Sequence, residues 1–97
     1  MEHVFEIIDK SGRKIILTKV RWEHITTKHP YMSNYLIEVE ETIRNPLKIV
    51  PRDIGDIYDF YNYYKHKKGK LKYLKIVVKY LNGDGFIISA YFVRCIN

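Results

Sequence analysis

Short runs of hydrophobic residues dominate the beginning of the chain. Residues 4–8 and 14–17 are rich in Val, Ile, Leu and Phe, and the segment between them contains Ser11 and Gly12. Two β-rich runs around a Ser-Gly turn are typical of a β-hairpin. The sequence therefore predicts an N-terminal hairpin.

A helix is predicted immediately after this hairpin, over residues 19–28. Thr18 offers a side-chain oxygen for the N-cap, and Trp22 and Ile25 lie on one helical stripe. Pro30 ends this helix, because the residue before a proline is pushed out of the α region.

A second helix is predicted from Ser33 or Asn34, either of which could cap it, to about Asn45. Three apolar residues spaced three and four apart form its buried stripe: Leu36, Val39 and Ile43. The Asn45-Pro46 pair stops it.

Everything after Pro46 has the pattern of strands, predicted at residues 47–50, 56–64, 71–81 and 86–96. The turn at residues 82–85, Asn-Gly-Asp-Gly, is a strong hairpin signal between the last two. The predicted fold class is α+β: an N-terminal hairpin, two helices, and an antiparallel four-stranded β-meander with the helices covering one face.

Alternation with period two assigns the faces of the last two strands. In the first, Leu74, Ile76, Val78 and Tyr80 form a core face; in the second, Phe86, Ile88, Ala90 and Phe92 share one side. The opposite face is expected to be a polar floor that carries Lys75, Lys79, Ser89 and Tyr91.

Length and composition exclude several classes of protein. The chain has 97 residues and is 46% hydrophobic, as expected for one globular domain spanning 1–97. A single cysteine, Cys95, excludes an internal disulfide framework. The longest nearly apolar run, residues 86–93, is far shorter than the roughly 18 residues of a membrane span, and the N-terminus does not resemble a secretory signal. We expect a cytoplasmic protein without membrane association.

Charge separates the two parts of the chain. Residues 1–60 carry a net charge of −1 and residues 61–97 a net charge of +7. A strongly basic segment favours an anionic partner, most often nucleic acid, although lysines also serve solubility alone.

Aromatic residues accompany this basic segment. Tyrosines contribute nine of the 97 residues. Tyrosine is a good strand former, but tyrosines interleaved with lysines could also stack on unpaired bases while the cations hold phosphate. The candidate nucleic-acid-binding residues are Lys65, Lys67, Lys68, Lys70, Lys72, Tyr73 and Lys75.

Two histidines, His24 and His29, are candidates for catalysis. Their spacing of five disfavours a zinc pair on one helix, where spacing four is used, so no metal or other cofactor is expected. If the helix reached His29, that residue would lie near the core and His24 on the surface. If the chain bends before Pro30, both imidazoles could face one cleft and serve as acid and base.

An ordered series of motifs extends over residues 20–93. It consists of Trp22-Glu23-His24-Ile25, then His29-Pro30, Ile43-x-x-Pro46, the tyrosine-rich strand, a Lys75–Lys79 segment, and Ser89-Ala90-Tyr91. The series resembles small phage-associated nuclease families of the barnase–EndoU–colicin–RelE superfamily, whose pattern is similar to W-x-H-I-x-x-x-H-P followed by a final T-A-Y. Here Ser89 replaces the usual threonine, and Tyr91 stands where toxin relatives carry a C-terminal arginine.

This resemblance implies a metal-independent ribonuclease with a curved four-stranded sheet. The catalytic residues it implies are His24, His29, Ser89 and Tyr91, with Lys79 and Tyr64 as further members. The 2′-hydroxyl of RNA would attack the adjacent phosphate, with the histidines as base and acid. The protein would be a toxin or a phage-related nuclease, a monomer or homodimer, with RNA and a cognate antitoxin or immunity protein as partners. The alternative is a non-catalytic RNA-binding or protein-interaction module on the same fold.

Overall fold

The computed structural model describes residues 2–96, which form six strands, two α-helices and one 3-10 helix. In chain order these are β1 (His3–Ile8), β2 (Lys14–Thr18), α1 (Lys19–Lys28), η1 (Pro30–Asn34), α2 (Leu36–Arg44), β3 (Lys48–Pro51), β4 (Ile57–Tyr63), β5 (Tyr73–Leu81) and β6 (Asp84–Val93). The predicted α+β class is confirmed. Within the described residues, no helix is long and apolar enough to cross a membrane.

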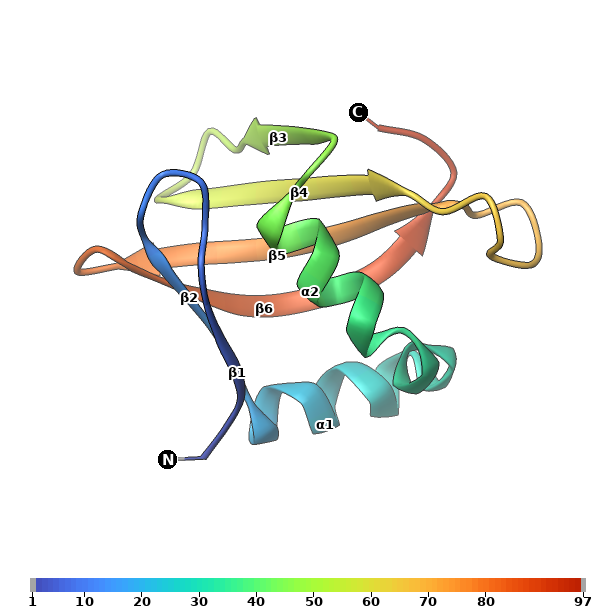
Figure 1. Ribbon diagram of the computed structural model, residues 1–97, viewed down its shortest axis with the longest axis horizontal. Helices are drawn as coiled ribbons and strands as arrows, with labels where there is room; N and C mark the ends of the chain where they lie inside the picture. Colours follow the sequence, from blue (N-terminus) through green and yellow to red (C-terminus); the bar gives the residue numbers. More distant parts are fainter. Residues whose placement is uncertain (1, 97) are drawn as a thin grey trace.

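All six strands belong to one sheet, in the order β1-β2-β6-β5-β4-β3 (Figure 1). Neighbouring strands are antiparallel except β2 and β6, which run parallel and pair only at Ile15–Gly85 and Ile16–Phe86. The predicted four-stranded antiparallel meander is therefore only part of the sheet. Local patterns predicted the hairpin and the meander separately, whereas the parallel contact that joins them links residues about 70 positions apart.

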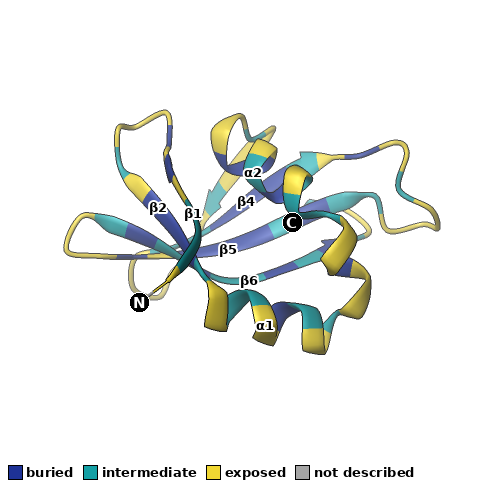
Figure 2. Ribbon diagram, turned by 60° about the horizontal axis from the view of Figure 1, so that its bottom comes forward, coloured by how far each residue is buried: buried dark blue, intermediate teal, exposed yellow. Residues whose placement is uncertain are grey.

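One face of the sheet packs against the helices to form the core. Val39 and Ile43 of α2 meet Leu74, Ile76 and Val78 of β5 in one buried cluster. Figure 2 shows that α2 lies over the central strands while α1 lies beside β6, beyond the point where β2 and β6 separate. The predicted core face of β5 is confirmed.

The first helix has the predicted bounds, and the second does not. Thr18 caps α1 by accepting a hydrogen bond from the backbone N–H of Arg21 at 3.1 Å. The 3-10 helix η1 occupies the segment where α2 was predicted to begin, so α2 starts at Leu36. Ser33 does not cap α2, because its hydroxyl lies in η1 and donates to the carbonyl oxygen of Pro30 at 3.1 Å.

A β-bulge changes the predicted faces of β6. Ser89 pairs with Val77 and Ile87 pairs with Val78, so Ile88 is an extra residue on β6. Ile87 is consequently buried in the core with Ala90 and Phe92, whereas Phe86 and Ile88 are only partly buried. The predicted grouping of Phe86 and Ile88 with Ala90 and Phe92 is wrong, because strict alternation does not survive an inserted residue.

Asp9 holds the turn between β1 and β2. One carboxylate oxygen accepts hydrogen bonds from the backbone N–H groups of Ser11 and Arg13 and from the Ser11 hydroxyl; the other accepts from the hydroxyl of Tyr80 at 3.1 Å. Burial alone would raise the pKa of Asp9, but these hydrogen bonds outweigh burial and lower it.

We expect Asp9→Asn to reduce the free energy of unfolding at neutral pH by about 1–3 kcal/mol. Because the folded-state pKa is lowered, the wild-type contribution of Asp9 is present above about pH 4 and is lost as the pH falls through the lower folded value. Urea unfolding at pH 7 and pH 2 measures this, with exposed Asp53→Asn as control. An equal deficit of Asp9→Asn at both pH values would contradict it.

Candidate functional site

A hollow of about 490 Å³ lies between α1 and the bulged part of β6. Both candidate histidines line it, together with Ser89 of β6. The remaining lining residues are Arg21, Ile25, Thr27, Lys28 and Ile88. The structure thus brings together three of the candidate catalytic residues: His24, His29 and Ser89.

The end of α1 explains how both histidines reach the same hollow. The last helical residue is Lys28, and His29 is the C-cap, with non-helical φ −128° and ψ 79°. Its backbone N–H still donates to the carbonyl oxygen of Ile25 at 2.8 Å, which fixes the direction of the cap. The chain therefore bends before Pro30, as the functional interpretation of this histidine pair requires.

The wall contributed by α1 is cationic. Arg21, His24 and Lys28 are spaced three and four apart, so they project from one stripe of the helix. No aspartate or glutamate is among the residues that line this hollow. Sequence reasoning missed Arg21 and Lys28, although their helical spacing from His24 was a usable signal.

His29 connects the hollow to the polar face of the sheet. Its ring stacks on Tyr91 of β6, with centroids 5.1 Å apart and planes at 24°. The ammonium group of Lys75 in β5 lies 5.7 Å from the centre of the same Tyr91 ring. Tyr91 pairs directly with Lys75, and Lys75 with Tyr61, so the three form a row across the sheet.

An ion pair that sequence reasoning missed lies next to this row. Asp59 of β4 is only 5% exposed, and Arg52, which follows β3, binds it with three nitrogen–oxygen distances of 2.9–3.1 Å. The hydrogen bonds that Arg52 donates to the Asp59 carboxylate raise the pKa of the guanidinium. Lys75 is also close, with its nitrogen 4.0 Å from an Asp59 oxygen. The composition of this tyrosine-rich strand does not predict that Asp59 is buried.

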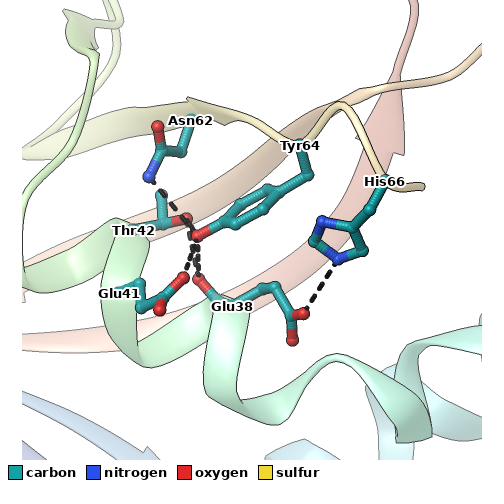
Figure 3. Close-up of polar contacts among 6 residues, drawn as sticks. All are labelled: Glu38, Glu41, Thr42, Asn62, Tyr64 and His66. Atoms are coloured by element: carbon teal, nitrogen blue, oxygen red, sulfur yellow. Dashed lines mark hydrogen bonds and ion pairs between the residues drawn. The ribbon is translucent and has the colours of Figure 1, made fainter.

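Tyr64 lies away from this group, on the core side (Figure 3). Its hydroxyl is 2.9 Å from Oε1 of Glu41 and 3.1 Å from the carbonyl oxygen of Glu38, both on α2. The side-chain amide of Asn62 donates to it at 3.4 Å. Burial and the Glu41 carboxylate raise the pKa of Tyr64 to about 12. This tyrosine stays neutral and links the end of β4 to α2.

The other predicted residues are spread over the surface. Lys79 is exposed on the polar face but lies four residues along β5 from Lys75, about 13 Å away. Tyr73 packs against Tyr63, with centroids 5.1 Å apart. Two lysines of the basic loop are engaged: Lys72 donates to the carbonyl oxygens of Lys65 and Lys67, and Lys67 lies 4.9 Å from the centre of the Phe92 ring. The exposed lysines of the loop are Lys65, Lys68 and Lys70.

Comparison with known proteins gave no relatives: no protein-family model, no curated protein and no solved structure matched the chain. In residues 2–96, no three His, Cys, Asp or Glu side chains gather closely enough to hold a metal ion. The arrangement that remains is a cationic hollow with two imidazoles and a hydroxyl, continuous with a row of aromatic and basic side chains.

The contacts of Tyr64 predict that Tyr64→Phe lowers the free energy of unfolding by about 1–3 kcal/mol, because the Glu41 carboxylate and the Glu38 carbonyl oxygen on α2 lose the Tyr64 hydroxyl as a donor. The matched control is the adjacent Tyr63→Phe, an exposed tyrosine on the other face, with an expected change within about 0.5 kcal/mol. Thermal and urea unfolding measure both variants. Equal stability of the two would show that the Tyr64 hydroxyl does not hold α2 to the sheet.

Proposed function

We propose that this protein is a metal-independent ribonuclease that binds an RNA phosphate in the hollow between α1 and β6. The observation that carries the proposal is that His24 and His29 line one cationic hollow together with Ser89. Two imidazoles beside fixed cations supply the groups that metal-free phosphodiester cleavage requires.

The residues have complementary roles in this proposal. Arg21 and Lys28 hold the phosphate, since both are cations on the wall of the hollow. Ser89 donates a hydrogen bond to a phosphoryl oxygen. Tyr91, stacked on His29, orients that imidazole, and Lys75 adds positive charge from the neighbouring strand.

The reaction proceeds by attack of the 2′-hydroxyl oxygen on the adjacent phosphorus. One imidazole accepts the 2′-hydroxyl proton, and the other, protonated, donates a proton to the 5′-oxygen as the phosphorus–oxygen bond breaks. The products are a 2′,3′-cyclic phosphate and a free 5′-hydroxyl. Imidazole suits both roles because it exchanges protons near neutral pH. Lys79 and Tyr64 have no part in this scheme, given their distance from the hollow and their contacts.

The wider biological proposal follows from the sequence resemblance. A small ribonuclease of this kind would act as a toxin or a phage-related nuclease, and a cell that makes it would need a cognate antitoxin or immunity protein. An acidic inhibitor that occupies the hollow would be complementary to Arg21 and Lys28.

We expect the purified protein to cleave mixed tRNA and mRNA in EDTA and to leave 2′,3′-cyclic phosphate ends. His24→Ala and His29→Ala should each lower the cleavage rate by about 10²–10⁴, the usual contribution of a general acid or base. His3→Ala, on β1, is the matched control and should retain the wild-type rate. Circular dichroism should show an intact fold in all three. Undiminished cleavage by both His24→Ala and His29→Ala would rule out the proposed mechanism.

A second candidate function, RNA binding without cleavage, is favoured by the exposed lysines of the loop between β4 and β5, Lys65, Lys68 and Lys70. Their side chains are available for phosphate contacts on a surface separate from the α1 hollow. Such binding would depend on salt, since each neutralised phosphate releases counterions.

One double variant and one triple variant distinguish the two possible RNA-binding surfaces. We expect Arg21→Gln/Lys28→Gln to weaken RNA binding and to reduce the slope of log K against log salt by about 1–2, since up to two phosphate contacts are lost. The comparison variant is Lys65→Gln/Lys68→Gln/Lys70→Gln, measured by fluorescence anisotropy with single-stranded RNA. A slope that falls only in the triple variant would move the RNA interface to the loop.

A further inference from the structure

A second cavity, of about 390 Å³, opens at a different part of the molecule. It lies between the β1–β2 turn, the C-terminal end of α2 and the first residues after it, and strands β3 to β5. None of its lining residues also lines the hollow beside α1. It therefore calls for an explanation independent of the proposed ribonuclease function.

The walls of this cavity are mainly apolar and aromatic. Phe60 and Ile43 are buried and belong to the core, whereas Ile49 is 45% exposed on the edge strand β3 and Pro46 is partly exposed before it. Tyr58 stands edge-to-face with Tyr80, with ring centroids 5.4 Å apart, and both rings line the cavity. Flat aromatic walls of this kind accept a planar ring.

The polar side of the cavity carries positive charge that the surrounding protein does not pair. The guanidinium of Arg13 lies 3.7 Å from the centre of the Tyr80 ring, and its Nε donates to the hydroxyl of Ser11 at 3.1 Å. Among residues 2–96, no carboxylate makes an ion pair with Arg13 or with the neighbouring Lys10. Stacking occupies the face of the guanidinium and leaves its two terminal nitrogens for a ligand.

Asp9 also lines the cavity, but its oxygens already accept hydrogen bonds. Ser11 and the backbone of Arg13 occupy one oxygen, and the Tyr80 hydroxyl donates to the other. These bonds fix the turn that carries Arg13. The guanidinium is consequently held in place from two sides, by the turn and by the Tyr80 ring. A fixed guanidinium beside an aromatic wall is suited to bidentate recognition of an oxyanion.

We propose that this cavity binds a small ligand made of a planar ring with a carboxylate or phosphate group attached. The ring lies against Tyr58 and Ile49, and the oxyanion pairs with Arg13 and Lys10. A volume of 390 Å³ is within the usual range for small-molecule sites, which are lined mostly by apolar and aromatic side chains with a few polar groups that set orientation. The shared chemistry covers two sources, an aromatic carboxylic acid and a nucleoside monophosphate.

Titrations followed by ¹H–¹⁵N correlation spectra test the proposal with the full chain. The probes are indole-3-carboxylate and adenosine 5′-monophosphate; their uncharged partners, indole-3-carboxamide and adenosine, and inorganic phosphate alone are the controls. We expect at least one charged ring to shift the amides of residues 10–13, 49 and 58 and to bind at least about tenfold more tightly than its uncharged partner, as loss of a charge-assisted contact implies. Which of the two charged rings binds identifies the source.

Three variants locate the site. Arg13→Gln and Lys10→Gln should each weaken binding, the first by about tenfold or more, and Ile49→Trp should abolish it by filling the mouth of the cavity without touching either cation. Arg94→Gln, an exposed arginine outside the cavity, should leave affinity unchanged.

Several results would overturn the proposal. These are the absence of shifts at residues 10–13, 49 and 58 with both charged rings, affinity equal to that of the uncharged partner, or unchanged affinity in Ile49→Trp. Shifts that appear instead at His24 and Ser89 would assign the ligand to the α1 hollow and leave the ribonuclease proposal standing. If the protein binds the charged ring in this cavity but does not cleave RNA, the ribonuclease proposal alone would be contradicted.

Discussion

The short parallel contact between β2 and β6 organises the rest of this structure. Only Ile15–Gly85 and Ile16–Phe86 pair, and the close approach depends on a residue without a side chain. A Cβ on Gly85 would lie 2.9 Å from Cε1 of Tyr80, closer than packed carbon atoms approach, and 3.0 Å from Cγ1 of Ile15 and 3.1 Å from Cγ1 of Val78, which are tight contacts. The N-terminal hairpin can join the C-terminal strands in one sheet because Gly85 admits the neighbouring side chains.

The hollow beside α1 is a consequence of where that contact stops. Beyond Ile16 the chain turns at Thr18 into α1, so the helix takes the place next to β6 that a continued strand would fill. A helix cannot pair with all the backbone hydrogen-bonding groups along the edge of a strand. One of these groups on β6, the backbone N–H of Phe92, donates instead to the hydroxyl of Tyr31 in η1 at 3.1 Å. At the bulge, Ile88 and Ser89 face the helix across open space instead.

Local signals predicted much of the fold, because they act over a few residues. The bounds of α1 follow from Thr18 and Pro30, and the β5–β6 turn follows from Asn82 and Gly83, which adopt positive φ of 55° and 87°. The β2–β6 pairing, the bulge at Ile88 and the start of α2 could not be predicted in this way. A bulge adds one residue without a change of composition, and strand partners far apart in sequence leave no local pattern. His24, His29 and Ser89 were candidates because of their residue types and their place in a motif. The ion pair of Arg52 with Asp59 depends on the pairing of β3 with β4, which the sequence pattern does not show.

Net charge counted along the chain also differs from charge gathered on a surface. The cations on the wall of the hollow, Arg21 and Lys28, belong to residues 1–60, whose net charge is −1. Some lysines of the basic C-terminal part make contacts within the protein. Lys72 donates to backbone carbonyl oxygens, and Lys67 lies over aromatic rings. Coulomb interactions weaken with distance and are screened within about 10 Å at ordinary ionic strength. The electrostatic energy of a bound ligand therefore depends mainly on the charges close to it. The positive charge on the wall of the hollow therefore comes from one helical stripe, whose position is set by the cap at Thr18 and the bend at His29.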